Sequence, residues 1–173
     1  MSSTVKIVAQ YHNYSPPVDV YSSVRLLLKY VPPEHLAGLQ KIVLTNSEEV
    51  GRQIRGKIRS EKNRVRPADC AGLYSKGRVI LLVDQILTQY PEIFLLVPMF
   101  KAYVVGEILY HEIGHHIHRL KKPRYRTEKE AVADQWKEKL LQGFFVRRYW
   151  YLAKLIQMFR PAINPIALWL RRA

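Results

Sequence analysis

Residues 104–118 read VVGEILYHEIGHHIH, and this stretch decides the fold because it combines the pattern of a buried helix with four histidines. Apolar residues and histidines share one helical face at spacings of 4, 3, 4 and 3: Val104, Ile108, His111, His115 and His118. A second apolar line is formed by Val105, Leu109, Ile113 and Ile117. The helix should therefore be buried on much of its circumference, and polar groups at that depth need partners.

His111-Glu112-Ile113-Gly114-His115 is the pattern in this helix that points to a metal. Two imidazoles four residues apart lie on one face of a helix and can occupy adjacent corners of a zinc tetrahedron. Glu112 can reach a water molecule at that metal and act as the general base, as H-E-x-x-H does in metallopeptidases. A helix whose histidines are merely hydrogen-bonded is the alternative. The pattern in this setting favours one bound Zn²⁺ ion.

Glu130 is the expected third zinc ligand. It lies in Glu130-Ala131-Val132-Ala133-Asp134, on a following helix that can fold back antiparallel after Pro123. Asp134 is on the same face and can accept the free N–H of a ligand histidine. The alternative for Glu130 is a capping box with Thr127, in which its side chain would bond the Thr127 amide.

Two further residues are alternative metal ligands. Glu128 is a spare carboxylate beside Glu130. His118 shares the face of His111 and His115, but it lies another turn along, so its ring would have to reach far back to the same ion. His116 is expected to point elsewhere and to belong to the ordinary surface.

The other expected elements lie on both sides of the motif. Pro98 suits the first position of a long helix to about Leu120, which the basic residues and proline of Lys121-Lys122-Pro123 end. A second helix should run from about Glu128 to Gln142, with Gly143 as its C-cap. Earlier in the chain we expect a helix at 18–30, a strand at 40–44, a solvated loop or exposed helix at 51–67, a β-hairpin of 71–74 and 78–83, and short helical turns at 84–90.

These motifs resemble the gluzincins, the thermolysin-like zinc peptidases, and most of all the compact minigluzincins. The resemblance covers about residues 18–143. It implies an α+β fold, a small zincin-like domain with a short mixed or antiparallel sheet, an active-site helix carrying HExxH and a following helix carrying ExxxD. It also implies an edge strand at Ala71, Gly72 and Leu73 that pairs with an extended peptide substrate, which is recognition by β-augmentation.

The chain departs from that family pattern in two respects. The interval from His115 to Glu130 is short, so the connection must be tight. No residue stands at a recognisable position for the Tyr or His that holds the oxyanion in larger members. The candidates for that role are Tyr110, His118, Arg147, Arg148 and Tyr149.

Composition and charge limit the setting in which the protein works. Lys and Arg number 28 against 14 Asp and Glu; residues 1–118 carry a net +4, and residues 119–173 a net +10. An anionic partner, either a membrane surface, a nucleic acid or an acidic protein, is therefore a candidate for the second half, although no nucleic-acid motif is present. Cys70 is the one cysteine, and neither a signal peptide nor an uncharged spanning segment is recognisable. We expect a cytoplasmic protein.

The sequence thus predicts two parts: residues 1–143 as the zincin-like peptidase domain and residues 144–173 as a basic, aromatic, helical extension. The extension is too apolar to stay free in water. It should either complete the core or cover the cleft and hold the peptidase latent. The expected function is zinc-dependent hydrolysis of a peptide or protein substrate. The alternative is a catalytically silent zinc protein that binds an anionic partner.

Overall fold

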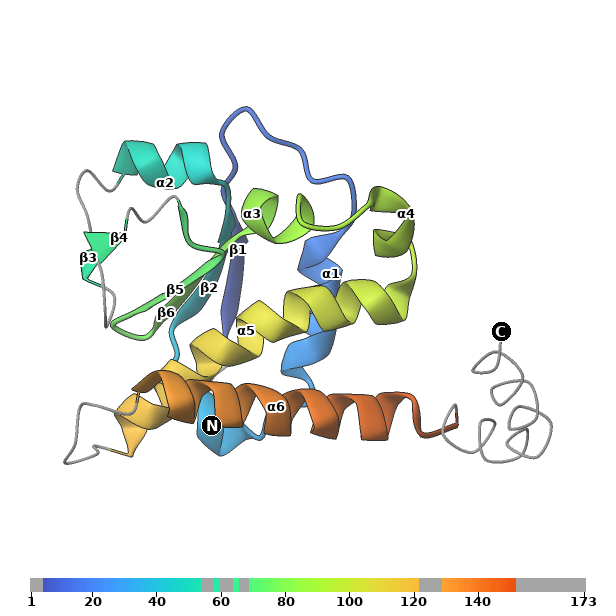
Figure 1. Ribbon diagram of the computed structural model, residues 1–173. Coiled ribbons are helices and arrows are strands. Elements are labelled where there is room, and N and C mark those ends of the chain that lie inside the picture. The colour runs from blue at the N-terminus through green and yellow to red at the C-terminus, as the bar shows by residue number, and fades with distance from the viewer. Residues whose placement is uncertain (1–4, 54–57, 60–63, 66–68, 122–128, 152–173) are drawn as a thin grey trace, which may run out of the picture. The chain divides into compact units, whose positions relative to one another are not determined.

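A small sheet and several helices make up the part of the chain that the computed structural model describes, which is residues 5–53, 58–59, 64–65, 69–121 and 129–151 (Figure 1). This arrangement confirms the expected α+β class. The strands are β1 (Lys6–Ala9), β2 (Lys41–Thr45), β3 (Ile58–Arg59), β4 (Arg64–Val65), β5 (Gly72–Ser75) and β6 (Arg78–Leu82). The helices are α1 (Val20–Leu28), the 3-10 turn η1 (Pro33–Leu36), α2 (Ser47–Gln53), α3 (Val83–Leu87), α4 (Glu92–Leu95), α5 (Pro98–Leu120) and α6 (Lys129–Arg148).

The main sheet is mixed and has the strand order β1-β2-β6-β5. β1, β2 and β6 run parallel, with Ile42 opposite Val79, whereas β5 runs antiparallel to β6, with Leu73 opposite Ile80. β5 is therefore an outermost strand of this sheet, as expected for residues 71–73. β1 was not among the expected elements, because four residues give too short a pattern to separate a strand from a loop.

The β5–β6 hairpin is confirmed, and its turn has a clear chemical cause. Lys76 and Gly77 both have positive φ, 45° and 78°. A two-residue turn with two left-handed residues matches the twist of the strands on either side, and glycine adopts that conformation without steric cost. Gly77 is also tightly enclosed, since a Cβ there would lie 2.8 Å from the carbonyl oxygen of Gly38.

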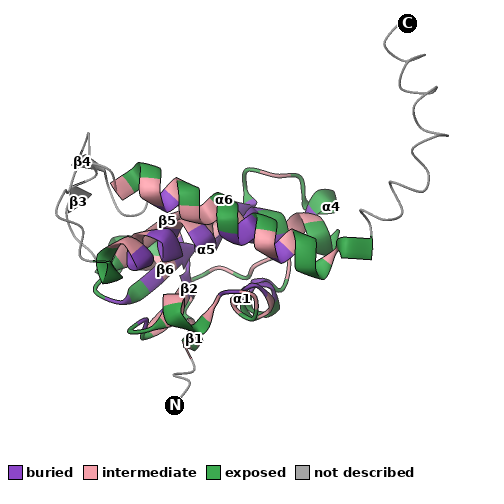
Figure 2. Ribbon diagram, turned by 90° about the horizontal axis from the view of Figure 1, so that it is seen from below, coloured by how far each residue is buried: buried purple, intermediate pink, exposed green. Residues whose placement is uncertain are grey.

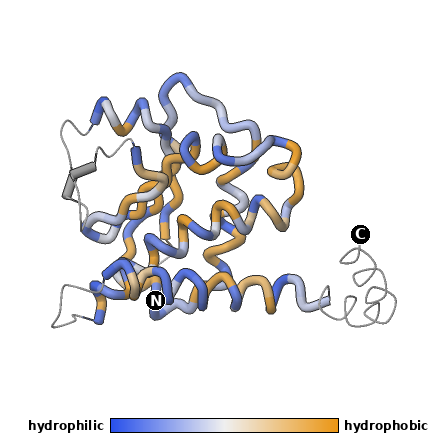
Figure 3. The backbone as a smooth tube through the Cα atoms, in the orientation of Figure 1, coloured by the Kyte–Doolittle hydropathy of each residue, from blue (hydrophilic) through white to orange (hydrophobic). Residues whose placement is uncertain are grey.

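α5 is the central helix of the fold, and its bounds are those that the sequence predicts. Pro98 occupies its first turn, and Lys121 follows its last residue. The helix contacts α1, α3, α4, η1 and the strands β5 and β6, so it is covered on most sides (Figure 2). Its second apolar line is fully buried: Val105, Leu109, Ile113 and Ile117. The strands above it are largely hydrophobic (Figure 3).

α6 is longer than expected, and Gly143 is not its C-cap. The helix continues through Gly143 to Arg148. Phe145 and Tyr149, four residues apart, stack at 5.6 Å between ring centroids, and the Tyr149 amide donates to the Phe145 carbonyl. Such i, i+4 aromatic contacts stabilise a helix and offset the cost of one internal glycine.

The chain divides into two compact units, Met1–Leu141 and Gln142–Ala173. Residues 142–151 of the second unit are described. The first residues of the expected extension, 144–148, are helical because they belong to α6. The remaining expectation, that the extension covers the cleft or completes the core, rests mainly on residues 152–173, which lie outside the described residues. Among the helices that are described, none has both the length and the apolar content needed to cross a bilayer.

His116 is buried in the core of the first unit, and the expectation that it belongs to the surface is wrong. Its exposed fraction is 2%, and its Nε2–H donates to the Ala37 carbonyl at 2.9 Å. Nδ1 then accepts from the Tyr74 hydroxyl at 2.9 Å. Burial lowers the pKa of His116, which keeps the ring neutral and able to accept. This network joins α5, the edge strand β5 and the loop after η1.

Tyr74→Phe tests the network. The substitution leaves Nδ1 of His116 buried without a donor, so we expect a loss of about 1–2 kcal/mol in the free energy of unfolding measured in urea. Tyr21→Phe is the matched control, because Tyr21 is 44% exposed and should change stability by less than about 0.5 kcal/mol. Equal effects of the two substitutions would show that the Tyr74–His116 bond does not stabilise the fold.

Candidate metal centre

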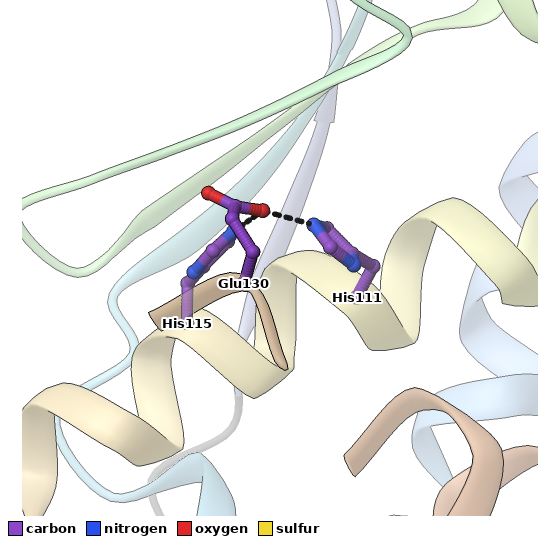
Figure 4. A group of neighbouring side chains, drawn as sticks. All are labelled: His111, His115 and Glu130. Atoms are coloured by element: carbon purple, nitrogen blue, oxygen red, sulfur yellow. Dashed lines mark ion pairs between the residues drawn. The ribbon is translucent and has the colours of Figure 1, made fainter. Parts of the chain in front are cut away.

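His111 and His115 lie side by side on α5, one helical turn apart. Their ring centroids are 4.7 Å apart, and the ring planes are nearly perpendicular at 89°. Both side chains point to the same side of the helix, where they meet the carboxylate of Glu130 (Figure 4). They are partly buried, with exposed fractions of 24% and 18%. Both rings therefore keep some contact with solvent.

Glu130 of α6 completes a group of three possible ligands. Its Oε2 is 3.3 Å from Nε2 of His111 and 3.5 Å from Nε2 of His115, so the carboxylate lies between the two rings (Figure 4). The three ligand atoms all lie within 4.8 Å of one another. Zinc bonds of about 2.0–2.2 Å at tetrahedral angles require ligand separations of about 3.3–3.6 Å. The measured separations from the carboxylate fit that requirement.

Asp134, one turn beyond Glu130, orients His111. Nδ1 of His111 is 3.1 Å from the Asp134 carboxylate, to which it donates. The proton is thereby fixed on Nδ1, and the lone pair of Nε2 is left free to bind an ion. Burial raises the pKa of Asp134, but the hydrogen bond and charge of Lys137 at 3.2 Å, together with His111, lower it overall. Sequence reasoning did not identify Lys137.

His115 is suited to metal binding by its protonation state. Burial lowers its pKa more than the Glu130 carboxylate raises it, and His111 lowers it further. The ring is therefore neutral near pH 7, as a metal-binding imidazole must be.

Glu112 is buried next to this group, with an exposed fraction of 5%. Burial, and after it the negative charge of Glu130, raise its pKa to about 8. A strongly perturbed carboxyl group beside possible metal ligands is characteristic of a functional site. A cation held between the histidines and Glu130 would oppose this shift, because it favours the charged carboxylate.

The edge strand β5 lies directly against Glu112. A Cβ at Gly72 would be 2.7 Å from Oε1 of Glu112 and 2.6 Å from Cγ2 of Ile108, so this position has no room for a side chain. Ala71 and Leu73, on either side of it, are partly exposed. The three residues expected to bind a substrate backbone therefore lie beside the expected general base.

α5 and α6 approach closely where both lack bulky side chains. A Cβ at Gly114 would be 2.7 Å from both the Cα and the carbonyl oxygen of Ala133. Ala133 is itself fully buried. Gly114 is part of the motif His111-Glu112-Ile113-Gly114-His115. The sequence alone does not show that this glycine packs against Ala133.

Of the two alternative ligands, only His118 is among the described residues, and it does not join this group. Glu128 lies outside the described residues. His118 is not among the described residues that gather within ligand distance of one another. Its Nε2 is shielded from solvent and has no hydrogen-bond partner among the described residues.

The structure tests one of the residues that were expected to stabilise an oxyanion. Tyr110 is wrong for the role: its side chain is fully buried, and its hydroxyl donates to the Leu27 carbonyl at 2.9 Å. Tyr110 lies on the face of α5 that packs against α1, whereas the histidines lie on another face. Arg147, Arg148 and Tyr149 belong to the second unit, so their role stays a prediction.

Comparisons of the chain with protein-family models, with curated proteins and with solved structures find no match. The interpretation of the metal centre therefore rests on the geometry and chemistry of the residues themselves.

Gly114→Ala tests the helix contact. The new methyl group collides with the Ala133 backbone, so we expect a loss of about 2 kcal/mol or more in stability, and weaker metal binding because Glu130 moves away from the histidines. Gly143→Ala is the matched control, since a Cβ there meets nothing within 4 Å. It should be neutral or stabilise by up to about 1 kcal/mol. Thermal unfolding and zinc titration of both variants measure these effects, and an undisturbed Gly114→Ala protein would contradict the close contact.

Proposed function

We propose that this chain is a zinc-dependent peptidase of the gluzincin type, with a zincin-like fold. His111, His115 and Glu130 would hold one Zn²⁺ ion, and Glu112 would be the general base. The observation that carries the proposal is the His111–His115–Glu130 group, whose ligand atoms lie within 4.8 Å of one another, with the buried carboxyl of Glu112 in the same helix.

The donor set fits zinc better than a harder cation. Two imidazoles and one carboxylate are the ligands of thermolysin-like catalytic sites, whereas magnesium and calcium prefer oxygen ligands alone. Three protein ligands also leave one position open, as catalytic zinc sites do.

When bound, zinc supplies a Lewis acid that polarises a peptide carbonyl and makes water more acidic. Glu112, in its charged form, accepts a proton from the attacking water and then delivers it to the amine that leaves. Asp134 keeps His111 in the tautomer that presents Nε2. Burial of Glu112 excludes bulk water from its carboxyl, which strengthens its interactions with a substrate.

The substrate class follows from β5. An extended peptide that pairs with the outer edge of this strand would pass beside Gly72, and therefore beside Glu112. Backbone pairing of this kind recognises peptides in general, and side-chain pockets decide which are preferred. Cys70 forms no disulfide, which agrees with a reducing compartment, and we propose a cytoplasmic location.

A second candidate keeps the metal without turnover. One observation favours it. The Tyr110 hydroxyl donates to the Leu27 carbonyl and is not available to stabilise the oxyanion of a peptide-cleaving reaction. In that case the protein would be a zinc-binding module. An anionic partner for the C-terminal half also stays a prediction, because most of that half's extension lies outside the described residues.

Glu130→Ala tests the third ligand. Removing the carboxylate should weaken zinc binding by at least about tenfold to a hundredfold in a chelator competition titration, because two imidazoles alone hold the ion poorly. Glu138→Ala, which removes an exposed carboxylate from the same helix, should bind zinc like the parent protein. Equal zinc affinity in the two variants would exclude Glu130 as a ligand.

Glu112→Gln tests the mechanism separately from the metal. It should retain one zinc ion per chain while the cleavage of quenched fluorogenic peptides falls by about 10²-fold to 10⁴-fold, since only the proton acceptor is lost. The exposed carboxylate variant Glu92→Gln should cleave at the parent rate. Cleavage by Glu112→Gln at the parent rate would refute the mechanism, and zinc binding without any cleavage by the parent protein would favour the silent module.

A further inference from the structure

A second cluster of functional side chains lies at the end of α5, apart from the metal ligands. We define the Trp136 cluster as His35 of η1, Lys121 after the last residue of α5, and Trp136 and Lys139 of α6. The ammonium groups of Lys121 and Lys139 are 4.7 and 4.8 Å from the centroid of the Trp136 ring. The His35 ring meets the same indole edge-on, with centroids 4.6 Å apart. One indole thus holds two cations in place.

No ion pair holds the two ammonium groups of this cluster: among the described residues, neither Lys121 nor Lys139 pairs with a carboxylate. Burial lowers the pKa of His35, the neighbouring Glu34 carboxylate raises it, and Lys121 and Lys139 lower it further, so these groups share one electrostatic environment. Two like charges held near one ring repel each other, and a bound anion would relieve that repulsion.

One further described cation lies close to the cluster in the sequence. Arg119, in the last turn of α5 and two residues before Lys121, is exposed. The whole chain carries a formal net charge of +14. A partner that neutralises this region must therefore present several negative charges along its length.

We propose that the Trp136 cluster binds the phosphodiester backbone of a nucleic acid. A nucleic acid presents one charge per nucleotide, so adjacent phosphates can contact the two held ammonium groups together. A lipid surface fits less well, because it also requires large apolar side chains that insert beside the charges. Within the described part of residues 119–141, Leu120 is the one strongly exposed large apolar residue, and Trp136 is partly buried.

This proposal does not depend on the proposed peptidase. None of the four residues of the Trp136 cluster belongs to the group of possible metal ligands. If both proposals hold, the chain is a peptidase that is concentrated on nucleic acid, where its substrates would be proteins bound to the same strand. Failure of either one leaves the other open to its own test.

The test uses the full chain and a fluorescein-labelled DNA duplex of about 20 base pairs, with anisotropy followed between about 50 and 200 mM NaCl. The double variant K121A/K139A should bind at least about tenfold more weakly at low salt than the parent protein. Its slope of log K against log salt should be shallower by about 1.8, because each phosphate contact contributes about 0.9.

The matched control is R25A/K29A, which removes two exposed cations from α1 and the residue after it. It should keep the parent slope to within about 0.5, and circular dichroism should show all three proteins folded. Parent-like binding by K121A/K139A, or an equal loss in both double variants, would overturn the proposal. So would binding of the parent protein to phosphatidylserine vesicles without binding to DNA.

Discussion

The contact between Gly114 and Ala133 is the constraint on which the candidate metal centre depends. Helices in proteins usually pack with axes 8–10 Å apart, and close approach requires small residues at the crossing point. On α5, His111 lies three residues before Gly114 and His115 follows it directly. On α6, Glu130 lies three residues before Ala133 and Asp134 follows it directly. The contact therefore sets all four side chains opposite one another, and a larger residue at either position would separate them.

The same helix joins the site to the rest of the fold. The histidines of α5 face Glu130 of α6, and Ile108 and Glu112 of the same helix meet the edge strand at Gly72. Farther along, His116 is hydrogen-bonded to Tyr74 of that strand and to Ala37. The position of β5 relative to the possible metal ligands is thus fixed by buried contacts. A site held on rigid elements in this way is preorganised for its ligand.

The elements near the motif could be predicted because their signals are local. Pro98 and Lys121 mark the ends of α5, and the turn at Lys76 and Gly77 marks the hairpin. What could not be predicted depends on partners that are distant in sequence. The burial of His116 could not be predicted from the helix pattern around it, because it depends on Tyr74 and Ala37, which are distant in the sequence. β1 has only four residues, and α6 continues past Gly143 to Arg148, where aromatic contacts follow the glycine.

X-ray absorption at the zinc edge reports the atoms around the ion in the intact protein, so it shows directly whether His111, His115 and Glu130 bind zinc. We predict two imidazole nitrogens at about 2.0–2.1 Å and light oxygen ligands at about 2.0–2.2 Å, in four or five coordination. Loss of one oxygen ligand in Glu130→Ala would agree with this prediction. A sulfur ligand at about 2.3 Å, or a spectrum with a single imidazole, would contradict the assignment of His111, His115 and Glu130 as the zinc ligands.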